Sequence, residues 1–239
     1  IDNLNIKPNG IYVDLTVGGA GHSTEILRRI KNGKLICVDQ DEEALSVARD
    51  RLLKISDNVL FYKSNFENFK EILDYFGIDK VDGVLLDIGV SSYQIDNGQR
   101  GFSYMIDAPL DMRMDRDLKK SAFELVDIIE RAIPKAVRAK GGHPAKRVFQ
   151  AIRIEVNREL EVIKKVIPDI VERLNKNGRL CIITFHSLED RIVKDSFKEL
   201  ARGCICPKEL YVCVCNNKPK IKILTKKPLV PSEEEMNRN

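Results

Sequence analysis

No apolar run in the 239 residues approaches the roughly 20 that a helix needs to cross a bilayer. The sequence also lacks a signal-peptide pattern at its start. We therefore expect a cytoplasmic protein with no membrane partner. A hydrophobic content of 43% is enough for a sizeable core, and the length suits one large domain or a core domain carrying an insertion.

Cysteine is also too sparse for a secreted disulfide scaffold, with six residues in the chain. Cys37 and Cys181 lie in apolar, strand-like runs and are expected to be small buried hydrophobic residues. The other four form two C-x-C pairs: Cys204 with Cys206, and Cys213 with Cys215. They suit either a Zn²⁺ site or a structural hairpin with free thiols. Because C-x-C is tighter than the usual C-x₂₋₄-C spacing, we favour the hairpin and predict no metal.

Charge is distributed unevenly. Residues 1–95 carry 11 Lys/Arg and 15 Asp/Glu, a net charge of −4, whereas residues 96–239 carry 29 and 21, a net charge of +8. Within Arg131–Arg158, eight basic residues face a single acid, Glu155. This pattern fits a small-ligand domain joined to a polyanion-binding surface, and ordinary solvated helix faces are the alternative.

Short apolar runs alternate with helical periodicity through the first half of the chain. The pattern predicts four strands rich in Val, Ile and Leu, which is typical of a parallel sheet buried on both faces. The strands are expected at Ile11–Leu15, Leu35–Asp39, Val59–Tyr62 and Val81–Ile88. The helices between them are expected at His22–Ile30, Glu42–Leu53 and Phe66–Phe76.

The second half departs from this alternation. An ordered loop is expected over Ser91–Met114, and a helix over Phe123–Ile133. A long helix over Ala145–Asn175, bent by Pro168 and stopped by Gly178, is predicted from apolar steps of three and four residues. A strand over Arg179–Thr184, a helix over Leu188–Leu200, and a β-ribbon with a polar tail from Gly203 complete the chain.

A glycine-rich turn follows the first predicted strand, in Asp14-Leu-Thr-Val-Gly-Gly-Ala-Gly-His-Ser23. Glycines there let a ligand approach the amides at a helix N-terminus. Asp39 ends the second strand, where an acid can accept hydrogen bonds from both ribose hydroxyls. Thr24 stands where a dinucleotide fingerprint wants its third glycine, and no G-K-[ST] of a P-loop is present. The turn therefore favours the methyltransferase form, D/E-x-x-x-G-x-G.

Seven stretches span most of the chain: Tyr12–Ser23, Val38–Asp41, Leu85–Ser92, Arg100–Ser103, Pro109–Asp115, His143–Arg153 and Phe185–Arg191. In these stretches and in their order, the chain resembles the small-subunit ribosomal RNA cytosine-N4 methyltransferases of the MraW/RsmH type. The family carries several tens more residues between Asp115 and Phe123. Either the substrate domain is reduced here or a stretch is skipped, and the polar, charged join favours the second.

The resemblance implies a Rossmann-like α/β core that binds S-adenosyl-L-methionine, with an inserted helical substrate domain. The domains are then residues 1–94 and 151–239 for the core, and 95–150 for the insertion. The acceptor is a cytidine in the decoding region of the small ribosomal subunit. The cofactor site is lined by Ala20, Gly21, His22, Asp39, Phe66, Asp87 and Gln94.

Cytosine N4 is a poor nucleophile, so hydrogen-bond acceptors on its N–H groups would favour the reactive form. The catalytic candidates are Asp87, at the end of the fourth strand, and Ser91 and Ser92, which follow that strand. The candidate RNA contacts are Arg113, His143, Lys146, Arg147, Arg153 and His186. For His186 and Asp190 the alternative is an ordinary helix start, with Ser187 as the N-cap. No cysteine is placed as a nucleophile that would attack C5.

Two other functions stay open: a nucleotide- and RNA-binding module without catalysis, and an NAD-linked oxidoreductase, which the missing third glycine disfavours. The sequence leaves monomer and homodimer both open.

Overall fold

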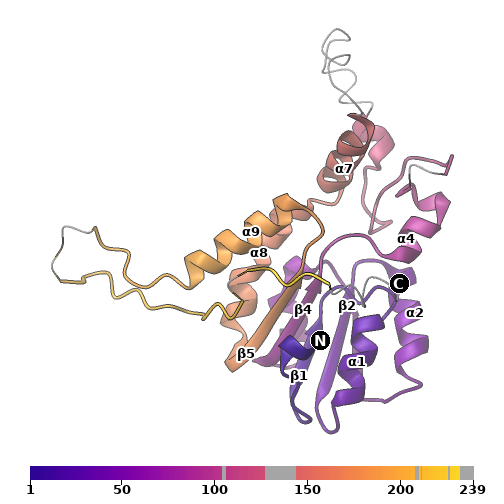
Figure 1. The fold of residues 1–239 in the computed structure, drawn as a ribbon. Coiled ribbons are helices and arrows are strands. Elements are labelled where there is room, and N and C mark those ends of the chain that lie inside the picture. The colour runs from indigo at the N-terminus through magenta and orange to yellow at the C-terminus, as the bar shows by residue number, and fades with distance from the viewer. Residues whose placement is uncertain (104–105, 127–143, 208–209, 211, 226, 232–239) are drawn as a thin grey trace.

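A five-stranded parallel sheet forms the centre of the computed structural model, which describes residues 1–103, 106–126, 144–207, 210, 212–225 and 227–231. The strand order is β3-β2-β1-β4-β5, the first five positions of the Rossmann order (Figure 1). The strands are β1 (Ile11–Asp14), β2 (Lys34–Asp39), β3 (Val59–Lys63), β4 (Val81–Asp87) and β5 (Leu174–Ile183). The predicted α/β class and its four first strands are confirmed.

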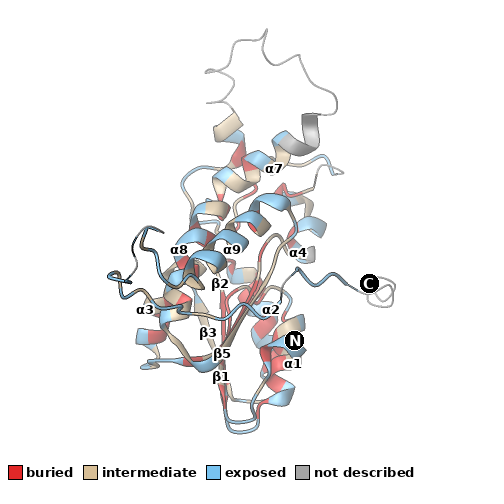
Figure 2. Ribbon diagram, turned by 60° about the vertical axis from the view of Figure 1, so that its left-hand side comes forward, coloured by how far each residue is buried: buried red, intermediate tan, exposed pale blue. Residues whose placement is uncertain are grey.

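Helices cover both faces of this sheet. On one face lie α1 (Gly21–Arg29) and α2 (Glu42–Leu52). On the other lie the short helix η2 (Phe66–Asn68), α3 (Phe69–Tyr75) and α8 (Glu159–Glu172), and α9 (Ser187–Leu200) packs beside α8. Side chains alternate along the strands, so Tyr12 joins the α1/α2 core and Val13 the α3/α8 core. Buried residues follow the strands and the helix faces turned toward them (Figure 2).

The predicted long helix over Ala145–Asn175 is wrong. It is two helices, α7 (Pro144–Val156) and α8, separated at Arg158, whose φ of 52° is left-handed. The buried side chain of Asn157 fixes the break, because its Oδ1 accepts a hydrogen bond from Met114 N (2.9 Å) and its Nδ2 donates to Met112 O (2.9 Å). The second helix ends at Glu172, before Gly178.

The strand β5 begins at Leu174, earlier than predicted, although its regular pairing with β4 starts at Arg179, opposite Gly83. An irregularity between Val81 and Gly83 accommodates the extra residues. The helix α9 agrees with its prediction apart from its first residue.

The segment after β4 contains α4 (Ser92–Asp96) and η3 (Gly98–Arg100), where a loop alone was predicted. This segment and α7 together form a small apolar cluster beyond the sheet. Its buried members are Phe102, Met112, Met114, Ala122 and Ile152, the last contributed by α7. Of the helix predicted over Phe123–Ile133, residues 122–126 are helical and the rest lie outside the described residues.

The β-ribbon predicted from Gly203 is wrong for the residues that can be described. Two arms lie side by side beyond α9 (Figure 1), without strand pairing in the described part of 203–231. Among the described helices, none is long and apolar enough to span a membrane.

Candidate active site

The carboxyl ends of β1 and β4 are neighbours in the sheet, where Asp14 pairs in register with Leu85. The connections from these two strands lead to opposite sides of the sheet, to β2 and to β5, and ligands bind at this switch point in such folds. The side chains that follow β1, β2 and β4 therefore meet at one edge.

Asp14 stabilises the glycine-rich turn through hydrogen bonds at both ends of the turn. Its carboxylate is buried, and it accepts hydrogen bonds from Ser23 Oγ (2.7 Å) and Thr16 N (3.2 Å). Burial raises the pKa of Asp14, and the bond from Ser23 opposes that rise. Gly18 and Ala20 both adopt left-handed backbone, with φ of 46° and 61°, so the turn is tight before α1 begins at Gly21.

Asp39 joins this turn to the end of β2. Its Oδ2 accepts from Gly18 N (3.0 Å) and its Oδ1 from Asp41 N (3.0 Å). Burial raises the pKa of Asp39 to about 6, although both backbone donors act to lower it. The Asp39 carboxylate lies at the end of β2, where the sequence predicts the acceptor of the ribose hydroxyls. Each of its oxygens has a lone pair left after its hydrogen bond with the backbone.

Asp87 lies across from the turn, at the end of β4. Its backbone N donates to Thr16 Oγ1 (2.7 Å), and its Oδ2 lies 3.3 Å from His22 Nε2. That contact is the main cause that raises the pKa of His22. The other oxygen, Oδ1, is buried and has no hydrogen-bond partner among the described residues. A buried, unpaired carboxylate oxygen beside a glycine-rich turn is suited to receive a ligand's donor.

Ser91 and Gln94 form a reciprocal cap at the start of α4. Gln94 N donates to Ser91 Oγ (3.2 Å), and Ser91 N donates to Gln94 Oε1 (3.1 Å). The Gln94 amide also donates to Asp41 Oδ2 (2.9 Å). Ser91 and Gln94 therefore stabilise the start of α4, and Gln94 connects it to the loop after β2. Ser92 is the first residue of α4, and its side chain is not among those that the structure describes.

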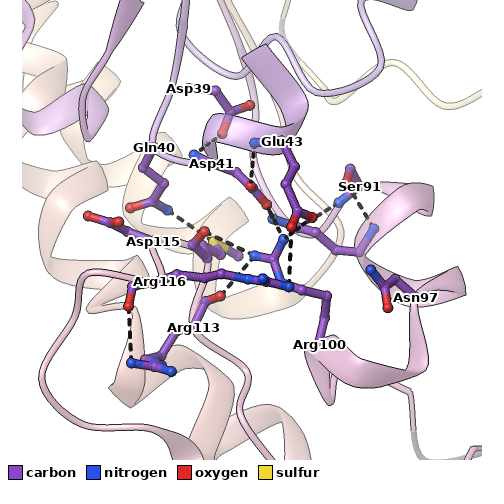
Figure 3. Close-up of polar contacts among 12 residues, drawn as sticks. Asp39, Gln40, Asp41, Glu43, Ser91, Asn97, Arg100, Arg113, Asp115 and Arg116 are labelled. Carbon is purple, nitrogen blue, oxygen red and sulfur yellow. Dashed lines mark hydrogen bonds and ion pairs between the residues drawn. The ribbon is translucent and has the colours of Figure 1, made fainter. Parts of the chain in front are cut away.

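Arg100 is a residue that the sequence analysis did not single out. Its guanidinium is fully buried and donates to Asp41 Oδ2 (2.7 Å), Glu43 Oε2 (3.1 Å) and the carbonyls of Arg113 and Met114 (3.0 and 3.1 Å). Figure 3 shows it at the centre of this cluster. It ties the segment after β4 to the loop that carries Asp39. The acidic run Asp41–Glu43 was the available signal for a buried cation.

A cavity of about 340 Å³ opens beside Asp39, between the ends of β2 and β3 and the junction of α7 with α8. Gln40 and Asn65 lie on its wall, joined by a hydrogen bond from Asn65 Nδ2 to Gln40 Oε1 (3.0 Å). Phe66, the next residue, is half-buried against the α3/α8 core. The described lining of this cavity includes none of the predicted cofactor residues. Asp39 and Asp87 lie instead at the carboxyl ends of β2 and β4.

Comparison with known proteins decides the family. The model of the MraW methylase family matches residues 1–127 and 119–239, which together span the chain. This chain belongs to the MraW methylase family. It is 52% identical to the ribosomal RNA small subunit methyltransferase H of Finegoldia magna and 50% identical to that of Clostridioides difficile, covering 100% of this chain and 91% of each relative. A solved rRNA methylase from Streptococcus thermophilus shows a distant likeness, with 17% identity, a TM-score of 0.44, and 81% and 74% of the two chains covered.

These comparisons also locate the missing stretch of the MraW-family pattern. The alignment with the Finegoldia magna relative runs over 284 positions for 239 residues here, which leaves 45 positions of the relative without a counterpart. The two family matches meet in residues 119–127, the join noted in the sequence.

Two of the arginines expected to contact RNA in this MraW-family chain are bound within the chain. Arg113 donates to both oxygens of Asp111 (2.6 and 3.0 Å), and Arg153 makes a two-pronged pair with Glu159 (2.9 and 2.8 Å). Lys146 and Arg147 lie on α7, but their side chains are outside the described residues, as is the whole of His143.

A helix, α9, does start here, as the alternative reading of His186 and Asp190 expected, but its N-cap is His186 and not Ser187. Glu189 reaches back to accept from Phe185 N (2.9 Å) and His186 N (3.3 Å), and its Oε1 lies 2.9 Å from His186 Nε2. Burial is the largest cause that raises the pKa of Glu189. Phe185 itself is largely exposed and touches the site at Gly89, where an added Cβ would lie 3.2 Å from its ring.

Proposed function

We propose that this chain transfers the methyl group of S-adenosylmethionine to the exocyclic N4 amine of a cytidine in small-subunit ribosomal RNA. Membership of the MraW methylase family and relatives named ribosomal RNA small subunit methyltransferase H support the reaction class and the RNA substrate. The observation that carries the proposal is the unpaired, buried Oδ1 of Asp87, whose other oxygen contacts His22 in the first turn of α1.

The residues present fit the cofactor. Gly19 and Gly21 have open space where a Cβ would stand, so a ligand can approach the turn closely. Asp39 offers carboxylate oxygens for the two ribose hydroxyls, and Phe66 supplies an apolar neighbour for the adenine. S-adenosylmethionine supplies an electrophilic methyl group, which the amine attacks in line. Gln94 supports the site indirectly, because its amide holds Asp41.

The chain's own task is to position the amine and exclude water. The cytosine N4 lone pair is delocalised into the ring, and an acceptor on its N–H favours the form whose lone pair is free. Asp87 Oδ1 provides that acceptor, while Oδ2 stays close to His22. As the N–C bond forms, the carbon–sulfur bond breaks, and N4 loses one proton to Asp87 or to water. Ser91 serves as the cap of α4, and we assign the contact with the amine to Asp87.

The target base must leave its stack to reach this edge of the sheet. We assign RNA binding to residues 95–150, between β4 and β5, whose described parts lie beyond the carboxyl ends of the strands (Figure 1). Its sequence carries the basic stretch that includes His143, Lys146 and Arg147. Since Arg113 and Arg153 are already paired with acids, Lys146 and Arg147 near the start of α7 are the better candidates for phosphate contact. Replacing Lys146 and Arg147 by Gln should weaken RNA binding and reduce its salt dependence.

Methyl transfer to small ribosomal subunits lacking the modification tests the reaction. Wild type, Asp87→Asn and Asp79→Asn are compared with labelled S-adenosylmethionine, followed by mass analysis of nucleosides. Asp79 is the control, because it lies in the exposed loop before β4, away from the site. We expect N4-methylcytidine from wild type and Asp79→Asn, and a loss of at least about 100-fold with Asp87→Asn.

Binding of S-adenosylmethionine, measured by calorimetry on the same three proteins, separates a methyltransferase from a binding module without catalysis. Tight binding without transfer by wild type would contradict the proposal and favour the non-catalytic binding module. A methylated nucleoside other than N4-methylcytidine would show that the acceptor atom is wrong.

A further inference from the structure

The four cysteines after α9 converge in space, although the sequence separates them into two pairs. All four Sγ atoms lie within 4.8 Å of one another. Cys215 Sγ is 3.6 Å from Cys213 Sγ and 3.8 Å from Cys204 Sγ. This convergence is a property of the folded segment that the C-x-C spacing does not reveal.

These two separations are close to the edge of a tetrahedron of sulfurs around one metal ion. A Zn–S bond of about 2.3 Å places neighbouring sulfurs about 3.8 Å apart in a tetrahedral site. A disulfide requires about 2.05 Å, and all four cysteines are free thiols. An iron–sulfur cluster would hold its cysteine sulfurs farther apart, because iron and sulfide lie between them. A single ion fits best.

The backbone around the sulfurs is arranged as a supporting shell. Ile205 N donates to Cys215 Sγ (3.3 Å), and Val214 N donates to Cys206 Sγ (3.4 Å). Each C-x-C arm thus gives the amide of its middle residue to the last sulfur of the other arm. Such N–H···S bonds orient a ligand and disperse the charge of a thiolate.

The base of the two arms is closed by Asn217. Its side-chain Nδ2 donates to the carbonyls of Arg202 (3.1 Å) and Gly203 (2.7 Å). Asn216, just after the last cysteine, adopts left-handed backbone with φ of 51°. Asn216 and Asn217 therefore fix the backbone conformation at the point where the chain turns back toward the body of the protein.

A hydrophobic core does not hold this segment together. None of the described residues between Gly203 and Asn217 is buried, and Val212 and Val214 expose 72% and 69% of their surface. Small segments without a core depend on a cross-link such as a disulfide or a structural metal. With the disulfide excluded by the sulfur separations, a metal is the remaining cross-link.

We propose that Cys204, Cys206, Cys213 and Cys215 bind one structural Zn²⁺ as a tetrathiolate. Binding releases the four thiol protons to solvent, and the closed coordination leaves no position for substrate. The basic residues at the base of the arms, Arg202, Lys218 and Lys220, offset the net charge of −2 on the zinc tetrathiolate. The sequence alone favoured free thiols, and the spatial convergence reverses that preference.

Another group with metal-binding side chains, Glu159 with His186 and Glu189, is less suited. Its Glu159 is already paired with both guanidinium prongs of Arg153. This cluster serves as an alternative location for any metal in the test below.

Metal analysis of the full chain, purified under reducing conditions without a metal-affinity step, is the first test. We expect one zinc per chain in wild type and in Cys181→Ser, the control on β5. The double variant Cys204→Ser/Cys215→Ser should hold none. Replacement by Co²⁺ should give a thiolate charge-transfer band and the intense visible bands of a tetrahedral site in wild type and the control, and neither in the double variant.

Limited trypsin digestion supplies a readout that does not depend on activity. Zinc-loaded wild type should resist cleavage between Cys206 and Cys213, and chelation or the double variant should make this segment the first to be cut. Reduced wild type that binds neither zinc nor cobalt overturns the proposal, as does native protein with two disulfides. Zinc retained by the double variant and lost in Glu189→Gln would place the metal in the other cluster, which also overturns it.

Discussion

Arg100 Nη1 lies 2.7 Å from Asp41 Oδ2, and the two side chains expose only 1% and 3% of their surface. The pair joins the segment after β4 to the loop after β2, across 59 residues of sequence. Breaking a buried ion pair leaves an uncompensated charge in a medium that solvates it poorly.

We therefore expect Arg100→Met to lower the free energy of unfolding by about 3 kcal/mol or more. Arg28→Met is the matched control, because Arg28 makes an equally short pair with Glu25 (2.7 Å) on the surface. That variant should cost less than about 1 kcal/mol. Urea unfolding of both proteins measures the difference, and equal losses would show that burial does not govern the pair.

The ionisation of Asp39 should make cofactor binding depend on pH. Its pKa of about 6 means that the carboxylate is ionised above this pH and protonated below it. Ribose hydroxyls donate to the ionised form, so S-adenosylmethionine should bind more weakly as the pH falls through 6, approaching tenfold per pH unit. Calorimetry across this range measures the effect. Asp39→Asn should bind weakly at every pH and lose this dependence; a variant with the wild-type profile would assign the titration to another group.

His22 should titrate above the ordinary histidine value because of its contact with Asp87. This contact stabilises the fold fully below about pH 6.5, and the stabilisation is lost as the pH rises through the raised pKa. Nuclear magnetic resonance titration can follow the imidazole, since the chain has three histidines. In Asp87→Asn the pKa of His22 should fall, whereas in Asp79→Asn it should stay; no change in the first variant would rule out Asp87 as the cause.

Gly101 and Gly77 offer a matched pair for separating backbone strain from steric overlap. Both have left-handed φ, 69° and 65°, but a Cβ at Gly101 would lie 2.5 Å from Pro109 O, whereas one at Gly77 has no neighbour within 4 Å. Gly77→Ala should cost about 1–2 kcal/mol from backbone conformation alone. Gly101→Ala should cost a further 1–3 kcal/mol or so from overlap. Thermal unfolding tests both, and equal costs would mean that the loop around Pro109 yields freely.

Local patterns were sufficient to predict the sheet and the glycine-rich turn. Strands buried on both faces leave continuous apolar runs, and a tight turn before a helix leaves glycines, so each signal lies within a few residues. The break at Arg158 had no such signal, because the apolar steps continue past it. It depends on the hydrogen bond that Asn157 donates to Met112 O and the one that it accepts from Met114 N, both more than 40 residues away.

The candidate site divides in the same way. Asp39 and Asp87 could be predicted to lie at one edge of the sheet, because each ends a strand and the carboxyl ends of parallel strands meet there. Arg100 was missed because its partners belong to another element. Arg113 and Arg153 were expected to face RNA, although acids stood close in sequence at Asp111 and Glu159. Their pairing could have been anticipated from those spacings, whereas the meeting of the four cysteines could not.

The loop from Asp39 to Asp41 contributes to both proposed binding regions. The Asp39 carboxylate contacts the turn where the cofactor is proposed to bind. The Asp41 carboxylate accepts hydrogen bonds from Arg100 and Gln94, which follow β4. Asp41 N also donates directly to Asp39 Oδ1. Thermodynamic reciprocity then sets a rule for this enzyme: to whatever extent the cofactor steadies the loop and so favours RNA, RNA favours the cofactor by the same factor.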